Sequence, residues 1–262
     1  MRRYLELLSV QIRSAALLSL QYRLDFWLES TMALFWVGTA LVPLYVLFSM
    51  RDGVAGWRAE EVLVVVGFFS ILKGVLSCAI QPSLSQAVEH IRKGTLDFML
   101  LKPVDAQFML STSKLELPHL ADVLAGLGII VWALCHIPRA PSALELLLSL
   151  ALFAAALAIL YALWILVISL AFRVVKVDNL SHLFESLFEA ARWPSSLFRG
   201  ALSIIFTFVV PLALMTTYPA LALLGRATLR HLAIACTVAA ALLWLSRYVW
   251  RRSIRSYTGA SS

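Results

Sequence analysis

Several titratable residues in this sequence have spacings that occur in reactive sites. Glu116 and His119 have the Glu-x-x-His spacing with which di-iron helical bundles hold metal, but such a site needs a second pair and two further glutamates. No metal site is therefore predicted. His182, Glu185 and Glu189 would share one face of a helix. A single turn of polar groups is more typical of a solvated or helix-packing face than of a catalytic centre.

Other charged residues lie inside apolar runs. Lys73 lies in the inner half of one predicted membrane span, Asp122 lies about one turn into another, and Asp25 and Glu29 lie at the inner end of a third. A charge at membrane depth is costly, so such residues usually pair or face water. These four residues are a candidate intramembrane polar cluster, in which Lys73 would pair with Asp122 or Glu29. The alternative is that Lys73 extends its ammonium to the interface, where the acids also lie.

The common catalytic and nucleotide-binding motifs are missing. The chain has no Gly-x-x-x-x-Gly-Lys-Ser/Thr loop to bind nucleotide phosphates, no His-Glu-x-x-His and no Gly-x-Ser-x-Gly. Its three cysteines, Cys78, Cys135 and Cys236, stand singly in apolar runs and predict neither a disulfide framework nor a zinc site. The chain is expected to bind no cofactor or metal of its own.

Composition sets the class of protein. The 262 residues are 61% hydrophobic and 14% charged, with a mean hydropathy of +0.86. A globular domain has about 25% charged residues, and a soluble core could not enclose this much apolar surface. Because apolar runs of the roughly 20 residues that a spanning helix needs recur along the chain, it is predicted to be an all-α integral membrane protein. Cytosol-facing Lys and Arg explain its net charge of +7, so no nucleic-acid partner is predicted.

Six transmembrane helices are expected within a single domain, residues 1–262. An amphipathic helix over residues 1–23 precedes them and lies along the inner membrane surface or, as the alternative, packs on a partner. One of the six crossings falls between residues 173 and 228, and the other five spans are expected at 26–50, 61–80, 118–137, 143–172 and 229–248. Ala121, Ala125 and Gly128 would give the third span a face of small residues for close helix contact.

Residues 81–105, called the elbow below, lie between two apolar runs but have the pattern of a small soluble helical unit. Ser83 and Gln86 fit a capping box, which predicts that a helix starts there. Gly94 predicts its end, because glycine readily adopts the left-handed conformation that stops a helix. A second short helix follows and ends before Pro103.

Residues 173–228 allow two paths. One makes 178–191 a cytosolic amphipathic helix and crosses the membrane with 203–223. The other makes 178–194 a short, polar fifth span and folds 195–225 into an external re-entrant pair. Non-helical backbone at membrane depth is tolerated only where protein covers it or it lines a cavity.

The distribution of basic residues predicts the orientation. With the N-terminus inside, five of the 22 Lys and Arg residues fall outside: Arg51, Arg58, Arg139, Arg226 and Arg230. Three have no clear side, namely Lys73, Arg192 and Arg199, and the other fourteen fall inside. Positive residues gather on the cytoplasmic side, so both termini and the elbow are expected in the cytoplasm.

The sequence resembles the ABC-2 type permease subunits of ABC transporters, and most closely a bacterial branch of uncharacterised ABC-2-like permease components. The residues that carry the resemblance are 21–26 (QYRLDF), 91–103 (IRKGTLDFMLLKP), 184–194 (FESLFEAARWP) and 210–225 (VPLALMTTYPALALLG). The elbow motif is the most specific of these, and the likeness covers essentially the whole chain. By analogy with the wider family, the path with the re-entrant pair is preferred.

The resemblance implies a multi-pass subunit of the bacterial cytoplasmic (inner) membrane, without catalysis of its own and acting in export. It would pair with a second permease subunit, alike or related, and with two separate ATPase subunits that bind ATP and Mg²⁺. The elbow would be the coupling helix held in a groove of the ATPase. The candidate ATPase-coupling residues are Glu89, Arg92, Gly94, Leu96, Asp97 and Pro103.

Two other functions are weighed against transport. The first is a membrane-embedded lipid-modifying enzyme that uses His119, Asp122, His182 or Glu185. It would need polar groups that converge at one depth, and the sequence shows them scattered. The second is an assembly or regulatory membrane subunit without a substrate path. Apolar span faces do not identify a cargo.

Overall fold

The computed structural model describes residues 2–50, 53–54, 56–172, 178–197 and 211–255. The longer helices in these ranges are α1 (Arg2–Gln21), α2 (Arg23–Ser49), α3 (Ala59–Val75), α4 (Gln81–Arg92), α7 (Leu120–His136), α8 (Ala143–Ser169), α9 (Asp178–Glu189) and α12 (Leu229–Arg255). Short α-helices in the same ranges are α5 (Leu96–Leu100), α6 (Ala106–Ser111) and α11 (Tyr218–Leu223). The π-helical segments described are η1 (Leu76–Ile80) and η7 (Ala213–Thr217). The 3₁₀ turns described are η2 (Leu117–His119), η3 (Leu170–Phe172), η4 (Ala190–Arg192) and η5 (Ser195–Leu197).

The chain is an all-α integral membrane protein, as predicted. Five helices in the described ranges are long and apolar enough to cross a membrane: Arg23–Ser49, Ala59–Arg92, Leu117–His136, Ala143–Ser169 and Leu229–Arg255. A shorter apolar helix covers Ala213–Leu223. The expected spans agree with these helices to within a few residues, except that the second and the last continue well beyond the predicted ends.

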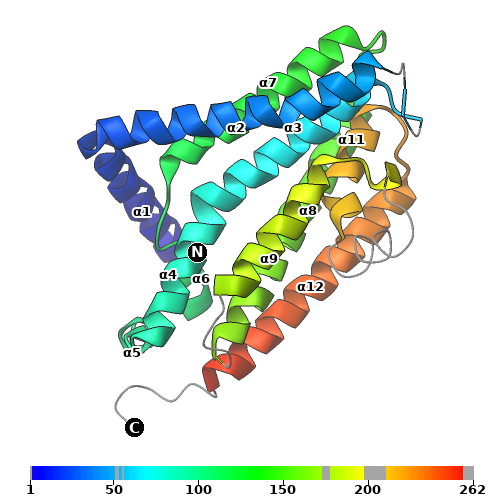
Figure 1. The fold of residues 1–262 in the computed structure, drawn as a ribbon. Coiled ribbons are helices and arrows are strands. Elements are labelled where there is room, and N and C mark those ends of the chain that lie inside the picture. Colours follow the sequence, from blue (N-terminus) through cyan, green and yellow to red (C-terminus); the bar gives the residue numbers. More distant parts are fainter. Residues whose placement is uncertain (1, 51–52, 55, 173–177, 198–210, 256–262) are drawn as a thin grey trace.

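The helices form an elongated body with the elbow at one end (Figure 1). Helices α8 and α12 run side by side, and α2 lies against α7, which packs along α3. The chain bends sharply after Gln21, so that α1 leads away from α2 back toward the elbow, where Tyr4 meets Phe108 edge to face at 4.8 Å between ring centroids. The N-terminal helix, the elbow and the end of α12 therefore share one end of the body.

Glycines set the close approach of α3 and α7. A Cβ atom added at Gly126 would lie 2.6 Å from the carbonyl oxygen of Gly67 and 2.9 Å from the backbone nitrogen of Ile71. The contact with α3 is therefore made by Gly126 and not by Gly128, which was predicted to lie on the contact face. Nothing lies within 4 Å of a Cβ added at Gly128. Helix contacts in membranes depend on such small residues because no hydrophobic force drives apolar helices together within lipid.

An ion pair ties α11 to the opposite end of the body from the elbow. Arg226 donates to both carboxylate oxygens of the buried Glu61, at 2.5 and 3.2 Å, and Glu61 also accepts from the backbone N–H of Arg58 at 3.0 Å. A buried carboxylate needs such partners because desolvation is costly. This ion pair holds the start of α3 against the segment that follows α11.

Residues 178–197 run along α3 toward the N-terminal end of α3. Gln81 donates to Glu185 at 2.6 Å, Lys73 to Glu189 at 2.6 Å, and the Trp57 indole to Ser196 at 3.0 Å. This is the direction that the path with a short polar fifth span requires. In the other path, which crosses the membrane only with 203–223, Ser196 would lie on the inner side and away from Trp57. Residues 198–210 lie outside the described ranges, so the re-entrant pair at 195–225 stays a prediction.

Replacing Gly126 tests the packing of α3 on α7. The Gly126→Ala variant should lose about 1–3 kcal/mol of stability, because its methyl group would overlap backbone atoms of α3. The Gly128→Ala variant is the matched control and should be as stable as the wild type or slightly more so. Thermal unfolding of the purified protein in detergent measures both. Equal midpoints for the two variants would show that this contact is not close.

Candidate functional site

The elbow is continuous with the second span. Helices α3, η1 and α4 form one helix, Ala59–Arg92, in which Pro82 lacks the N–H that would bond the carbonyl of Cys78. The backbone N–H of Glu116 donates to this carbonyl at 2.8 Å instead. The predicted helix start at Ser83 was therefore wrong: Ser83 is buried mid-helix, where its hydroxyl donates to the carbonyl of Lys114 at 2.6 Å.

The far end of the elbow helix is closed as the sequence predicted. Gly94 has φ +69°, a conformation that glycine adopts without strain. The N–H of Thr95 donates to the carbonyl of His90 at 3.0 Å, and the His90 ring lies 2.8 Å from the Thr95 hydroxyl. Leu96, at the start of α5, is fully buried in the main core. The turn at Gly94 is thus held by the hydrogen bonds of Thr95 to His90 and by the buried Leu96 that follows.

The outer surface of the elbow is charged at one place and apolar at another. Glu89 and Lys93 form an exposed ion pair of 2.6 Å, and Arg92 and Pro103 are also exposed while Asp97 is half-buried. Beside them Phe98 is 71% and Leu101 81% exposed. These two were not predicted, because residues 96–101 are apolar apart from Asp97 and have no clear period. The outward side of this run became evident only from the burial of Leu96.

Polar contacts connect the elbow region to α8 and α12. Arg247 in α12 donates to Asp105 at 3.0 Å and to Gln107 at 2.6 Å, and Gln107 donates to the hydroxyl of Tyr161 in α8 at 3.1 Å. Hydrogen bonding from the Arg247 guanidinium lowers the pKa of Asp105, so this carboxylate stays charged at neutral pH. The elbow region is therefore in contact with α8 and α12, in addition to its continuity with α3.

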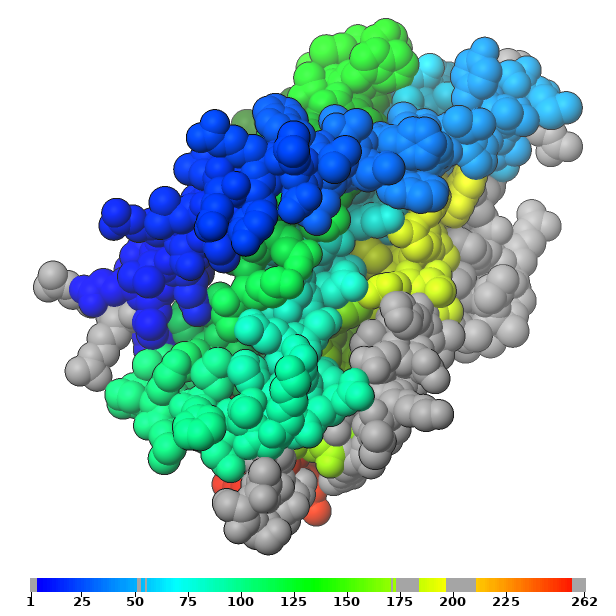
Figure 2. Space-filling model, turned by 60° about the vertical axis from the view of Figure 1, so that its left-hand side comes forward, coloured from blue at the N-terminus to red at the C-terminus, as the bar shows by residue number. Residues whose placement is uncertain are grey.

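A cavity of about 560 Å³ lies between α2, α3, α7 and η4. Figure 2 shows the face of the molecule on which α2 crosses this region, with the elbow below it. The apolar part of the lining consists of Met32, Ala33, Trp36, Val37, Ala40, Val66 and Phe69. The polar part consists of Glu29, Thr39, Ser70, Lys73, Ser77, His119, Asp122, Glu189 and Arg192.

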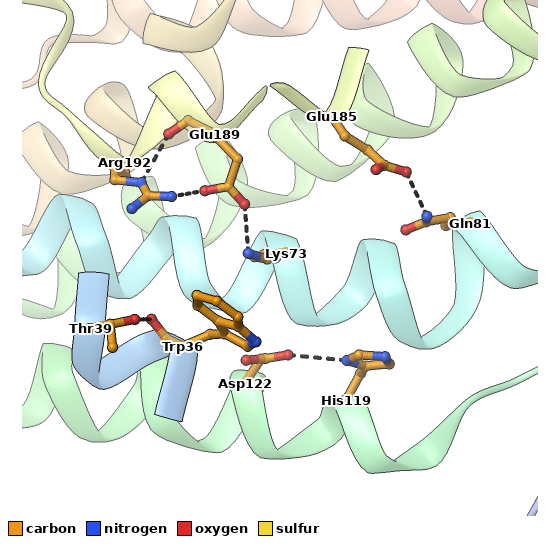
Figure 3. A network of polar contacts seen from close by, with 9 residues as sticks. All are labelled: Trp36, Thr39, Lys73, Gln81, His119, Asp122, Glu185, Glu189 and Arg192. Atoms are coloured by element: carbon orange, nitrogen blue, oxygen red, sulfur yellow. Dashed lines mark hydrogen bonds and ion pairs between the residues drawn. The ribbon is translucent and has the colours of Figure 1, made fainter. Parts of the chain in front are cut away.

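Two polar groups face each other across this cavity (Figure 3). On one side Lys73 donates to Glu189 at 2.6 Å, and Arg192 pairs with the same carboxylate. On the other side the buried Asp122 lies 3.3 Å from the His119 ring. The expected pairing of Lys73 with Asp122 or Glu29 was wrong: α9 runs back along the second span, and its last residue, Glu189, reaches the lysine.

The predicted polar cluster is brought together in part. Glu29, Lys73 and Asp122 line the cavity, whereas Asp25, one turn before Glu29, does not. Sequence reasoning missed Glu189 and Arg192 as members. Their spacing of three residues in an otherwise apolar stretch was the signal, but without the fold it did not say what they face.

The other reactive candidates are not assembled. Glu185 accepts from Gln81 and does not line the cavity, and the side chain of His182 lies outside the described part of the structure. Within the described ranges no three His, Cys, Asp or Glu side chains are grouped closely enough to hold a metal ion, and Glu116 with His119 is no exception.

Comparison with known proteins gives the family. A family model described as "ABC-2 family transporter protein" matches residues 34–261. No curated protein and no solved structure matches the chain. The family match covers the elbow, four of the five candidate spans and the first span from Leu34 on, while Glu29, Met32 and Ala33 of the cavity lining lie before it. The chain therefore belongs to the ABC-2 family of transporter proteins and is a membrane permease component of an ABC transporter.

Proposed function

We propose that this permease is driven by separate ATPase subunits that hold its elbow, and that it acts in export. The observation that carries the proposal is the single helix Ala59–Arg92, which joins the far end of the membrane body to an elbow with exposed Phe98 and Leu101. Exposed apolar side chains next to charged ones are typical of a protein-binding surface. A partner that grips this surface would move α3 directly.

The coupling residues fall into two groups. Glu89, Arg92, Asp97 and Pro103 would contact the ATPase, together with Phe98 and Leu101. Leu96 and Gly94 would act from within, since Leu96 anchors the elbow in the core and Gly94 forms its turn. Closure of the ATPases on ATP and Mg²⁺ would then press the elbow against α8 and α12 and shift the spans as rigid bodies.

The ATPase partners would supply the phosphate-binding loop that this chain does not contain. A second permease subunit, a copy or a relative, would complete the transport pathway through the membrane. The elbow and both ends of the chain face the cytoplasm of a bacterial cell, in line with the distribution of basic residues. Export is favoured because the polar residues of the cavity gather toward the elbow end, where cargo from the cytosol or the inner leaflet would enter.

A membrane-embedded enzyme is the second candidate. The contact between His119 and Asp122 inside a cavity that also holds Lys73 and Arg192 favours it, because a histidine oriented by a carboxylate is a common general base. The variants His119→Ala and His182→Ala separate the two functions, since an enzyme would lose its activity and a permease would keep transport. A purely regulatory subunit would co-purify with an ATPase whose activity no substrate stimulates.

Charge substitutions at the elbow surface test the ATPase contact. Phe98→Glu and Leu101→Glu should each reduce the recovery of the ATPase subunit with the tagged permease by tenfold or more, because central apolar anchors dominate such interfaces. Both side chains are exposed, so the permease itself should fold. Met50→Glu is the matched control, as Met50 is 80% exposed at the opposite end of the body. Normal recovery with both elbow variants would refute the contact.

The turn at Gly94 tests coupling rather than binding. Gly94→Val places a β-branched residue at φ +69°, which costs about 1–3 kcal/mol and distorts the elbow. The complex should still assemble and hydrolyse ATP, while transport into inverted vesicles per ATP consumed should fall severalfold. Gly38→Val, at a glycine of α2 without positive φ and with nothing within 4 Å of an added Cβ, is the control. Transport that stays in proportion to hydrolysis in Gly94→Val would remove the coupling role.

A further inference from the structure

The cavity between α2, α3, α7 and η4 has a polar end and an apolar end. Arg23 begins α2 at the end where α1 turns back to the elbow. At about 1.5 Å per residue, Glu29 lies roughly 9 Å along α2 from Arg23, and Trp36 lies roughly 20 Å along it. On α3, which runs toward the elbow, Val66 and Phe69 precede Lys73. Glu29 and Lys73 thus lie toward the elbow end and most apolar lining residues lie deeper in the membrane body, although Arg192 lies over the Phe69 ring, 5.6 Å from its centroid.

The polar end adjoins a second hollow that reaches the elbow. This hollow, of about 620 Å³, is lined by Gln81, Ser85, Gln86, Glu89, Lys114 and Glu116, and it shares Ser77 and His119 with the cavity. Its lining is polar, as a water-filled approach would require. A molecule in the cavity could therefore keep a hydrated head near His119 while its apolar part lies against Trp36.

The charges around the polar end leave one acid without a partner. Lys73 and Arg192 both pair with Glu189, and Asp122 contacts His119. Glu29 makes no hydrogen bond or ion pair with any residue that the structure describes. Glu29 is exposed at the inner end of α2, where its carboxylate is open to a positive charge from outside the chain.

We propose that this cavity binds an amphipathic molecule whose head carries a positive charge. The head would lie between Glu29 and Asp122, and the tail would lie along Met32, Trp36 and Phe69. The volume of about 560 Å³ falls in the range of small-molecule sites. Both a zwitterionic lipid and a free cationic amphiphile have this chemistry. The proposal concerns binding alone and does not depend on ATPase coupling.

The test uses three probes with the same brominated dodecyl tail and different heads: trimethylammonium, phosphocholine and phosphate. Bromine quenches tryptophan fluorescence only at short range, and Trp36 lines the apolar part of the cavity. The full-length permease, held in an amphipathic polymer without added lipid, is titrated with each probe. Trp36 is itself 63% exposed, so quenching is assigned to the cavity only where it disappears in Trp36→Phe and also responds to Glu29→Gln.

The two heads with a trimethylammonium group should quench Trp36 at concentrations at least tenfold lower than the phosphate head. Glu29→Gln should raise their half-quenching concentrations about tenfold and leave the phosphate probe unchanged, while Asp25→Asn, on the same helix outside the lining, should change neither. A lower value for phosphocholine would identify a lipid-like ligand, and a lower value for trimethylammonium a free cation. Equal quenching by all three heads, or no effect of Glu29→Gln, would overturn the proposal. Neither result would bear on the binding of the ATPase.

Discussion

One hydrogen bond removes the obstacle that Pro82 places in the longest helix of this protein. A proline deprives the carbonyl four residues earlier of its helical donor, and a helix with an unsatisfied carbonyl tends to bend or stop there. Here the N–H of Glu116, from the segment that leads into α7, takes the place of the missing donor on Cys78. The π-helical segment η1, after which the N–H of Gln81 donates to the carbonyl of Leu76 five residues earlier, ends two residues before Pro82. The first helix of the elbow is therefore a continuation of the second span and not a separate helix joined to it by a loop.

The rest of the structure supports that extension at both ends. At the elbow, the buried Leu96 and the contacts of Arg247 with Asp105 hold it against α8 and α12. At the opposite end, Glu61 and Arg226 fix the start of α3. Between them, the close approach of Gly67 and Gly126 joins α3 to α7. A force on the elbow is thus applied to a braced helix, and the cavity beside Lys73 lies along its length.

The sequence predicted the class, five of the six expected spans and the end of the elbow helix, because hydropathy and a glycine stop are local signals. It failed where the outcome depends on contacts between distant segments. Ser83 and Gln86 have a sound capping pattern, yet a partner 34 residues beyond Pro82 keeps the helix unbroken. Lys73 was assigned the wrong acid, since only the fold shows that Glu189 returns along α3. Phe98 and Leu101 could not be separated from buried neighbours before Leu96 was placed.

The distance between spin labels at the two ends of the helix Ala59–Arg92 tests this account most directly. In a cysteine-free background, Glu60→Cys with Lys93→Cys marks that helix, and Lys93→Cys with Leu144→Cys compares the elbow with the far end of α8. In the complex with the ATPase, the first distance should stay single, at roughly 50 Å, with and without ATP, whereas the second should change. A first distance that shifts or splits on ATP binding, with the second unchanged, would show a hinge at Pro82 and contradict the account.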